Sequence, residues 1–518
     1  MNETVSYYDQ NAEAFIEGTL HADMSAARER FLQYVPAGGS LLDAGCGSGR
    51  DTLAFQQAGY QVDAFDASEE VCRISSKVLG FPVQCMRFED LTGESKYDGI
   101  WACASLLHVA ADDLEDVIHR LKKLLKPNGV LYASWKEGSG ERVKDGRFFH
   151  DMTLEKCSEL FEGAGLTVLE SYRSQDVREG REGEAWVNVI GRKTELNWSV
   201  LGTGVIANEM ASALQKMGRR LYSVANRTHE KAVSFAEKYQ VEVVYDRIDD
   251  VFEDEKVDII YITTPHNTHY EFMRKALEAG KHVFVEKSIT LNSRELDEMV
   301  ELADRKRLVI GEAMTIWHMP LYKRLWSIVE SSRLGKVQMI TVNFGSFKEY
   351  DMRNRFFNMD LAGGAMLDIG VYALSIVRSF MSEQPDQIVS QWKPSPTGSD
   401  EQGTVLLMNA QGEMASVALS MHSKQPKRAM ISCEKGYIEI MEFPRADRAV
   451  IVDAATGERE EITAGASADA LCYELLDMEE AVKSGNTAPL KLAYTKDVMD
   501  TMTRLRKDWG MKYPGEEW

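Results

Sequence analysis

The 518-residue sequence lacks cysteine pairs, long apolar runs and an excess of basic charge. Its seven cysteines are scattered, and none stands in a Cys-x-x-Cys pair or beside a His-x-x-x-His pair. This spacing argues against a structural zinc site and suits a reducing compartment, and we expect no bound metal. The polar N-terminus and the lack of an apolar run near the ~20 residues of a membrane helix lead us to expect a cytoplasmic protein.

Acidic residues outnumber basic ones by 81 to 60, so the formal net charge is -21. Such a surface repels nucleic-acid phosphates and anionic membranes, and we expect small-molecule partners instead. No internal repeat or low-complexity tract is visible. The length favours about three domains. We place a first domain at residues 1–192, a short polar linker at 193–197, a second domain at 198–320 and a third at 321–518.

The first informative stretch is a glycine-rich turn in residues 41–51, Leu-Leu-Asp-Ala-Gly-Cys-Gly-Ser-Gly-Arg-Asp. It follows a predicted strand at 40–43 and precedes a helix. Asp43 is expected to place a carboxylate inside the turn, where it suits an ammonium group better than a pyrophosphate. The next predicted strand, 62–65, ends at Asp66, whose carboxylate can hold both hydroxyls of a ribose.

This pattern resembles the class I S-adenosylmethionine-dependent methyltransferases over about residues 1–192. Strands at 83–88, 97–102 and 130–134, and closing strands at 167–172 and 185–190, would complete the seven-stranded sheet typical of that family. Arg87 stands where the family often has Asp, which leaves the backbone of Phe88 to meet the adenine. The resemblance implies an S-adenosylmethionine site formed by Asp43, Gly45, Gly47, Asp66, Phe88 and Ala104.

Methyl transfer requires mainly that the acceptor, methyl group and sulfur be aligned. We therefore expect the acceptor pocket around the glycine turn, formed chiefly by Tyr8, His108, Arg147 and Trp186, with Tyr7, Lys136, Phe149 and Arg178 as further candidates. Each side chain alone is also compatible with a solvated or packed role. The basic members favour an anionic acceptor.

A second glycine turn, Ser-Val-Leu-Gly-Thr-Gly-Val-Ile-Ala, spans residues 199–207. Gly202 permits a tight turn, Gly204 lets a pyrophosphate approach the backbone at Thr203 and Ile206, and Ala207 keeps the helix close to the strand. A bare glycine turn without a ligand is the alternative.

The next predicted strand, 221–225, ends in Asn226 and Arg227 where an NAD site usually has an acidic residue. Arg227 would accept a 2′-phosphate, so NADP is favoured over NAD. The alternative is a solvated arginine at a helix start.

Residues 257–288 contain two apolar strands, each followed by polar residues. They resemble the Gfo/Idh/MocA oxidoreductases through a Thr-Pro-x-x-x-His motif at 264–269 and a Glu-Lys pair at 286–287, and the resemblance extends over about 197–518. It implies that the cofactor also contacts Thr264, Pro265, Asn267, His269, Glu286 and Lys287.

Residues 363–372 resemble the substrate-side helix of the same family, with Asp368 and Tyr372 one turn apart on one face. Tyrosine at the last position resembles the branch of dimeric dihydrodiol dehydrogenases and glucose-fructose oxidoreductase. We expect Lys287, Asp368 and Tyr372 to be catalytic, with the Lys287 ammonium lowering the tyrosine pKa. The alternative is that none of them is catalytic: Tyr372 would lie at the edge of the core, Lys287 at the surface, and Asp368 would be an ordinary helix residue.

Two residues depart from the family pattern. Ser288 replaces a proline after Lys287, and because a cis bond before a residue other than proline costs about 2.5–4 kcal/mol, we expect Lys287 to be presented differently. Trp317 stands where Arg is frequent, which we expect to reshape the substrate pocket.

From residue 337 onward, alternating strands indicate a largely antiparallel sheet through which relatives often dimerise. The predicted fold class is thus α/β, with two Rossmann-like nucleotide-binding domains in tandem followed by an α+β domain with an open sheet. We interpret the chain as a fusion of a methyltransferase and an NADP-dependent oxidoreductase acting on a sugar, cyclic polyol or related carbonyl compound. A regulatory module that senses NADP, or a nicotinamide-dependent glycosidase, remains an alternative for the second half.

Overall fold

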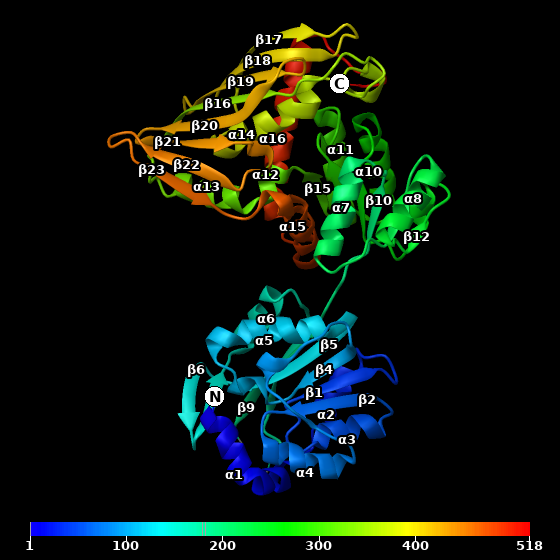
Figure 1. Ribbon diagram of the computed structural model, residues 1–518, viewed down its shortest axis with the longest axis vertical. Coiled ribbons are helices and arrows are strands. Elements are labelled where there is room, and N and C mark those ends of the chain that lie inside the picture. The colour runs from blue at the N-terminus through cyan, green and yellow to red at the C-terminus, as the bar shows by residue number, and fades with distance from the viewer. Residues whose placement is uncertain (1, 179, 182, 518) are drawn as a thin grey trace. The chain divides into compact units, whose positions relative to one another are not determined.

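The computed structural model describes residues 2–178, 180–181 and 183–517, and the chain forms two compact units, residues 1–195 and 196–518 (Figure 1). The first unit contains a seven-stranded sheet in the order β3-β2-β1-β4-β5-β9-β8. The first five strands in this order, from β3 across to β5, are parallel, and β9 is antiparallel to both of its neighbours. The strands are β1 (Ser40–Ala44), β2 (Gln61–Asp66), β3 (Gln84–Cys85), β4 (Tyr97–Ala102), β5 (Leu125–Lys136), β8 (Thr167–Gln175) and β9 (Ala185–Arg192).

Helices cover both faces of this sheet (Figure 1). They are α1 (Asn2–Thr19), α2 (Ser25–Leu32), α3 (Arg50–Gln57), α4 (Glu69–Leu79), α5 (Ala111–Leu124) and α6 (Leu154–Gly163), with 3-10 turns η1 (Phe88–Asp90) and η2 (Leu106–His108). Helix α5 illustrates how a helix is held on the sheet. Its large apolar residues recur at helical spacing and are all buried, namely Leu114, Val117, Ile118, Leu121 and Leu124. One apolar stripe therefore fixes the helix on the sheet.

The sequence interpretation missed a hairpin formed by β6 (Gly140–Lys144) and β7 (Arg147–Asp151). Its turn is Asp145-Gly146, and both residues have positive φ, which is the hairpin signal that the sequence carried. The third strand is also shorter than the predicted 83–88. Its chain turns into η1 instead, because the Asp90 carboxylate accepts a hydrogen bond from the Arg87 amide, at 3.0 Å.

The second unit begins with a six-stranded parallel sheet in the order β12-β11-β10-β13-β14-β15. Its strands are β10 (Trp198–Leu201), β11 (Ser223–Ala225), β12 (Val243–Val244), β13 (Ile259–Ile262), β14 (His282–Glu286) and β15 (Ile310–Ala313). Its helices are α7 (Val205–Lys216), α8 (His229–Tyr239), α9 (Asp250–Glu253), η3 (His266–Thr268), α10 (His269–Glu278), α11 (Ser293–Lys306) and α12 (Thr315–His318). Every residue of β10 and β13 is buried, as a parallel sheet covered on both faces requires.

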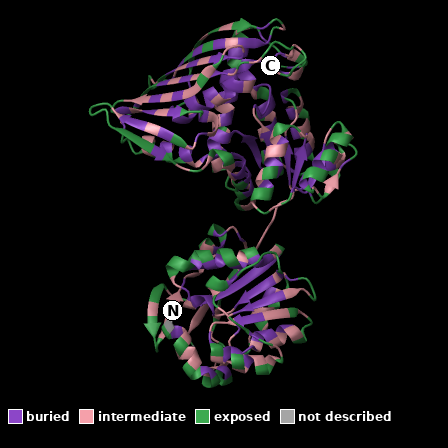
Figure 2. Ribbon diagram, in the orientation of Figure 1, coloured by how far each residue is buried: buried purple, intermediate pink, exposed green. Residues whose placement is uncertain are grey.

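An eight-stranded sheet follows, and all its pairs are antiparallel except β16 with β19. Its strands are β16 (Val337–Gly345), β17 (Gln387–Pro394), β18 (Asp400–Met408), β19 (Met414–Ser420), β20 (Gln425–Cys433), β21 (Gly436–Met441), β22 (Arg448–Asp453) and β23 (Arg459–Thr463). Figure 2 shows buried residues alternating with more exposed ones along these strands, so one face is open. The predicted fold class is thereby confirmed. The last two strands were missed: β23 is a charged edge strand, whereas β22 carries the apolar run Ala-Val-Ile-Val that marks a strand.

The remaining helices of this unit are α13 (Pro320–Glu330), η4 (Met359–Leu361), the π-helix η5 (Met366–Gly370), α14 (Val371–Phe380), η6 (Phe443–Arg445), η7 (Ser467–Asp469), α15 (Ala470–Ser484), η8 (Ala488–Leu490) and α16 (Leu492–Asp508). Helix α16 packs on α11 and β15. One segment, Met359–Phe380, is apolar and long enough to cross a membrane, although the sequence interpretation found no such run. Within its most apolar window 78% of the residues are buried, which is typical of a core helix.

Candidate active sites

The first crevice lies between β1 and β4, where the strand order of the first sheet reverses. Open parallel sheets bind ligands at this switch point, beyond the carboxyl ends of the strands. Gly45 brings the two loops together: its φ is +80°, and a Cβ there would lie 2.4 Å from the Cβ of Ser105. Ser105 donates a hydrogen bond to the carbonyl of Ala44, at 2.6 Å. No side chain fits at Gly45 without separating the loops.

Asp43 is not inside the turn, and this expectation was wrong. It lies in β1 and is buried, and its carboxylate accepts a hydrogen bond from the Thr52 hydroxyl at 2.6 Å. Burial and the nearby charge of Asp51 raise the pKa of Asp43 to about 7. The carboxylate therefore holds β1 against α3 in this structure.

Asp66 stands at the carboxyl end of β2, as predicted, and points to the glycine turn. Its carboxylate accepts hydrogen bonds from the amides of Gly47 and Ser68, each at 3.0 Å. Burial raises its pKa, and these two amides oppose the effect. The Phe88 ring of η1 packs edge to face against the Phe65 ring of β2, with ring centroids 5.3 Å apart.

Ala104 has a positive φ of 52°, and its amide donates a hydrogen bond to the Ser134 hydroxyl at 2.9 Å. It lies directly before Ser105, whose side chain meets the glycine turn. Gly45, Gly47, Asp66 and Ala104 thus lie around the switch point of the first sheet, which is what we call the first crevice.

Three of the four predicted acceptor residues meet above this crevice. The Tyr8 hydroxyl lies 3.0 Å from Nε2 of His108, and the Arg147 guanidinium lies over the rings of Tyr7 and Phe149, at 4.6 and 5.3 Å from their centroids.

Trp186 belongs to a neighbouring group, where its indole donates to Asp176 at 3.2 Å. Arg178 forms a two-pronged pair with the same Asp176. Lys136 connects the two groups, because its ammonium lies 5.9 Å from the Phe149 ring and 5.6 Å from the Trp186 ring.

The second crevice repeats this geometry between β10 and β13. Gly202 has a φ of +101°, and a Cβ there would lie 2.8 Å from the Thr263 hydroxyl. Gly204 has open space around it, and Ala207 is fully buried at the helix–sheet contact. A cavity of about 830 Å³ opens beside the turn, lined on one side by Thr203 and Gly204 and on the other by Arg445 and Leu471.

Asn226 and Arg227 follow β11 at the same edge of the sheet, and Arg227 is exposed. Thr264, Pro265 and Asn267 follow β13 there, with the Thr264 hydroxyl 2.7 Å from that of Thr268.

His269 differs from the prediction of a cofactor contact. It is fully buried, and its two ring nitrogens lie 2.8 and 3.0 Å from the carbonyls of Thr264 and Ser288. It therefore holds the turn after β13 against the segment after β14.

Lys287 follows β14, and the Lys287–Ser288 peptide bond is cis, although the serine led us to expect another presentation. The Ser288 hydroxyl donates to the Leu367 carbonyl at 3.0 Å. His266, which the sequence interpretation did not select, lies 3.0 Å from the Lys287 carbonyl. Glu286, before the lysine, accepts a hydrogen bond from the buried Tyr261 hydroxyl.

The three predicted catalytic side chains meet at this edge. The Lys287 ammonium donates to the backbone carbonyl of Asp368 at 2.7 Å and to its carboxylate at 3.1 Å, and it lies 5.0 Å from the centroid of the Tyr372 ring. Although burial alone would raise it, the charges of Lys287 and Arg355 lower the pKa of Asp368 to about 2. The ion pair is therefore charged at neutral pH.

Tyr372 is a neutral phenol in this structure, against our expectation. Burial raises its pKa well above the usual value, and the charges of Glu286 and Glu474 add to the effect. The prediction of a lowered pKa considered only Lys287, because the sequence did not show that two carboxylates lie nearby.

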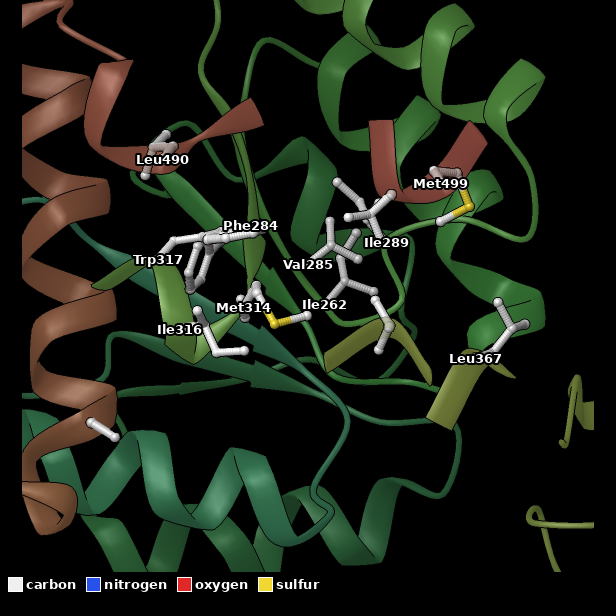
Figure 3. Close-up of a cluster of buried hydrophobic side chains, with 14 of the residues drawn as sticks. Ile262, Phe284, Val285, Ile289, Met314, Ile316, Trp317, Leu367, Leu490 and Met499 are labelled. Atoms are coloured by element: carbon white, nitrogen blue, oxygen red, sulfur yellow. The ribbon is translucent and has the colours of Figure 1, made fainter. Parts of the chain in front are cut away.

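Trp317 does not reshape a substrate pocket, so that prediction was wrong. Its side chain is fully buried in an apolar cluster with Phe284, Ile316 and Leu490 (Figure 3). Its indole donates to the Thr495 hydroxyl at 3.3 Å, which in turn donates to Glu312 at 2.8 Å.

Arg355 is a further site residue that the sequence did not reveal. Its guanidinium lies 3.7 Å from the Asp368 carboxylate and 4.8 Å from the Phe356 ring, and the side chain is about half exposed, at 55%. It lies in the irregular segment between β16 and η4, where no periodic pattern indicates which side chains turn inward.

Three protein-family models match parts of the chain. Residues 16–171 match the model of a methyltransferase domain. Residues 196–313 match the oxidoreductase family with an NAD-binding Rossmann fold, and residues 322–439 match the GFO/IDH/MocA C-terminal domain.

Individual relatives align with the second unit. The trans-1,2-dihydrobenzene-1,2-diol dehydrogenase of Sus scrofa is 27% identical over 337 residues, which are 62% of this chain and 99% of the relative. The Homo sapiens enzyme of that name is 26% identical over 336 residues, with the same two coverages.

Solved structures share the fold of this unit. The 3-ketoreductase KijD10 of Actinomadura kijaniata, in complex with NADP and TDP-benzene, aligns with a TM-score of 0.54 at 20% identity, covering 60% of this chain and 96% of that one. The UDP-N-acetylglucosamine 3-dehydrogenase GnnA of Acidithiobacillus ferrooxidans gives 0.53 at 18%, covering 60% and 97%.

Proposed function

Because the chain joins a methyltransferase domain to the two domains of a Gfo/Idh/MocA oxidoreductase, we propose that it is a bifunctional enzyme. The first unit transfers a methyl group from S-adenosylmethionine to a small molecule. The second transfers hydride between NADP and a sugar, cyclic polyol or related carbonyl compound.

The cluster of Lys287, Asp368 and Tyr372 carries the oxidoreductase assignment. Bound NADPH would supply the hydride. Asp368 fixes the Lys287 ammonium beside the tyrosine ring, and the neutral Tyr372 hydroxyl is in the protonation state needed to donate a proton to a carbonyl oxygen. The ammonium then stabilises the phenolate that remains. Because Tyr372 is protonated before the reaction, the site favours reduction of a carbonyl over oxidation of an alcohol.

Tyr372→Phe tests this role. We expect the variant to lose at least about 100-fold in NADPH oxidation with a panel of keto sugars and cyclic ketones, as removal of a general acid does. NADPH binding, measured by its fluorescence, should be unchanged. Tyr270→Phe is the matched control, because that tyrosine pairs with Glu298 outside the crevice. Near-normal turnover by Tyr372→Phe would refute the role.

The choice of NADP rests on Asn226 and Arg227, which follow β11 where NAD sites usually have a carboxylate. The NADP complex of the ketoreductase KijD10 agrees with this choice. Arg227→Ala should raise the KM for NADPH and leave that for NADH unchanged. An equal effect on both cofactors would contradict the assignment.

The methyl donor site rests on Gly45, Gly47 and Asp66 around the first crevice. Asp66→Ala should abolish binding of S-adenosylmethionine in calorimetry. Asp63→Ala is the matched control, because Asp63 lies on the same strand and pairs with Lys96 at the surface. Unchanged binding by Asp66→Ala would contradict the site.

We further propose that the protein acts in the cytoplasm on small molecules and dimerises through the open face of the eight-stranded sheet. Large apolar side chains are exposed on this sheet, between 40% and 68%, at Met339, Val389, Leu406, Met414 and Met441. Val389 and Leu406 pair across neighbouring strands, as do Met339 and Met414. Sedimentation of Leu406→Glu should show a monomer where the unmodified chain is a dimer.

A further inference from the structure

Helix α1, the turn η2 and strand β7 meet over the first crevice. The Thr4 hydroxyl of α1 accepts a hydrogen bond from the Phe148 amide of β7, at 2.9 Å. The Phe15 ring of α1 covers the glycine turn, since a Cβ on Gly47 would lie 3.2 Å from it. These three elements therefore meet beside the glycine turn of the proposed methyl donor site.

His108 has a fixed tautomer. Its Nδ1 lies 2.6 Å from the carbonyl of Phe148, which can only accept, so Nδ1 carries the proton. Nε2 then has a free lone pair, which accepts the hydrogen bond from the Tyr8 hydroxyl. Burial, reinforced by the charge of Arg147, lowers the pKa of His108 to about 4, so the imidazole is neutral at pH 7. It is able to accept a proton.

Tyr8 is suited to relay that proton and not to act as a phenolate. Burial raises its pKa, and the charge of Arg147 opposes the effect without reversing it. The hydroxyl therefore keeps its proton at neutral pH and donates it to His108, and its oxygen, which also has the Arg147 side chain as a hydrogen-bond donor, keeps one lone pair for the acceptor hydroxyl.

Arg147 is the third side chain of this cluster, after His108 and Tyr8. Among the residues described, its buried Nε has no hydrogen-bond partner. The nearest carboxylate, that of Asp145, is 3.9 Å from a terminal nitrogen and mostly exposed. The planar guanidinium lies between the rings of Tyr7 and Phe149. A guanidinium whose buried Nε has no partner is suited to a carboxylate or phosphate.

We propose that the methyl acceptor is an anionic small molecule that is methylated on a hydroxyl, with Arg147 binding its anionic group and Tyr8 and His108 removing its hydroxyl proton. This inference rests on the proposed methyl transfer from S-adenosylmethionine. The acceptor oxygen forms a bond to the methyl carbon while the carbon–sulfur bond breaks, and the bonding pair stays on sulfur. The hydroxyl proton passes to the Tyr8 oxygen as the Tyr8 proton moves to Nε2 of His108.

The experiment uses the full chain with S-adenosyl-[methyl-³H]methionine and the small-molecule fraction of a cell extract, split on an anion exchanger into anionic and neutral pools. We expect label in a product of the anionic pool that survives mild base, as an ether does and a methyl ester does not. Label only in the neutral pool, a base-labile product, or no label from protein that binds S-adenosylmethionine in calorimetry would each overturn the inference. Failure of that binding would instead contradict the proposed function.

Substitutions test the role of each residue, with the rate of formation of the labelled product as the readout. His108→Gln should lower turnover about 100-fold without weakening S-adenosylmethionine binding, and Tyr8→Phe should lower it in the same direction. His119→Gln, at an exposed histidine of α5, is the matched control and should retain full turnover.

Arg147→Gln should raise the KM for the acceptor at least 10-fold with little change in kcat. If it instead weakens binding of S-adenosylmethionine, the guanidinium binds the carboxylate of the donor and the assignment of an anionic acceptor fails. Unchanged turnover in His108→Gln would overturn the proton relay.

Discussion

Lys287→Met offers a quantitative test of the second crevice that does not require the substrate. The pKa of Asp368, about 2 against an ordinary 3.8, corresponds to about 2.5 kcal/mol of favourable interaction, to which Lys287 contributes most and Arg355 next. Methionine keeps the length of the side chain and removes the charge. We therefore expect the variant to lose about 2 kcal/mol of stability at pH 7, because Asp368 keeps only the more distant Arg355.

The loss depends on pH with a definite sign. A carboxyl whose folded pKa is lowered contributes its full stability above 3.8 and loses it as the pH falls toward 2. Without Lys287, burial raises the pKa of Asp368, so the variant no longer has this stability to lose. The difference between the two proteins should therefore be largest near pH 7 and shrink below pH ~4.

Scanning calorimetry of the full chain can measure this, with the transition of the second unit identified by its shift on adding NADPH. A loss of about 2 kcal/mol should lower that transition by roughly 3 °C. The double variant Lys287→Met, Asp368→Asn should recover part of the loss, since no unpaired carboxylate remains. An unchanged transition at pH 7, or a difference that grows on acidification, would refute the reasoning.

Three further predictions follow from buried groups. Burial raises the pKa of Glu312 to about 7, so Glu312→Gln should stabilise the second unit by about 3 kcal/mol at pH 8 and by little near pH 4.5, measured by calorimetry. Because the folded pKa of His108 is about 4, the first unit should lose up to about 3 kcal/mol as the pH falls from 6.5 through 4, and His108→Gln should remove this dependence. Trp317→Ala should cost about 3–5 kcal/mol, as expected for a fully buried tryptophan, while a substrate effect without loss of stability would contradict its core position.

The sequence predicted what depends on local patterns. Apolar runs and glycine turns, together with the family resemblance that they carry, indicated both Rossmann-like domains; the close approaches of Gly45 to Ser105 and of Gly202 to Thr263 appear only in the structure. Motif positions also brought Lys287, Asp368 and Tyr372 to one place.

What failed depends on tertiary surroundings. The pKa of Tyr372 is raised first by burial and then by Glu286 and Glu474, and Glu474 is 102 residues further along the chain and carries no motif. Trp317 was assigned to a pocket because a motif position says nothing about which way the side chain turns; the apolar cluster around it decides that. Arg355 was missed because irregular segments have no period from which its direction could be derived.

The two crevices share one backbone plan and differ in charge, and this difference supports two different ligands. At the end of the second strand the first unit has Asp66, whose carboxylate is held against the glycine turn, whereas the second unit has Asn226 and the exposed Arg227. A carboxylate at this point favours ribose hydroxyls and repels an added phosphate, while a guanidinium attracts one. The first glycine of each turn has a positive φ in both units, so our proposal of two different ligands rests on the residue at the strand end: a carboxylate for a nucleoside that ends in a sulfonium, and a guanidinium for a phosphorylated dinucleotide.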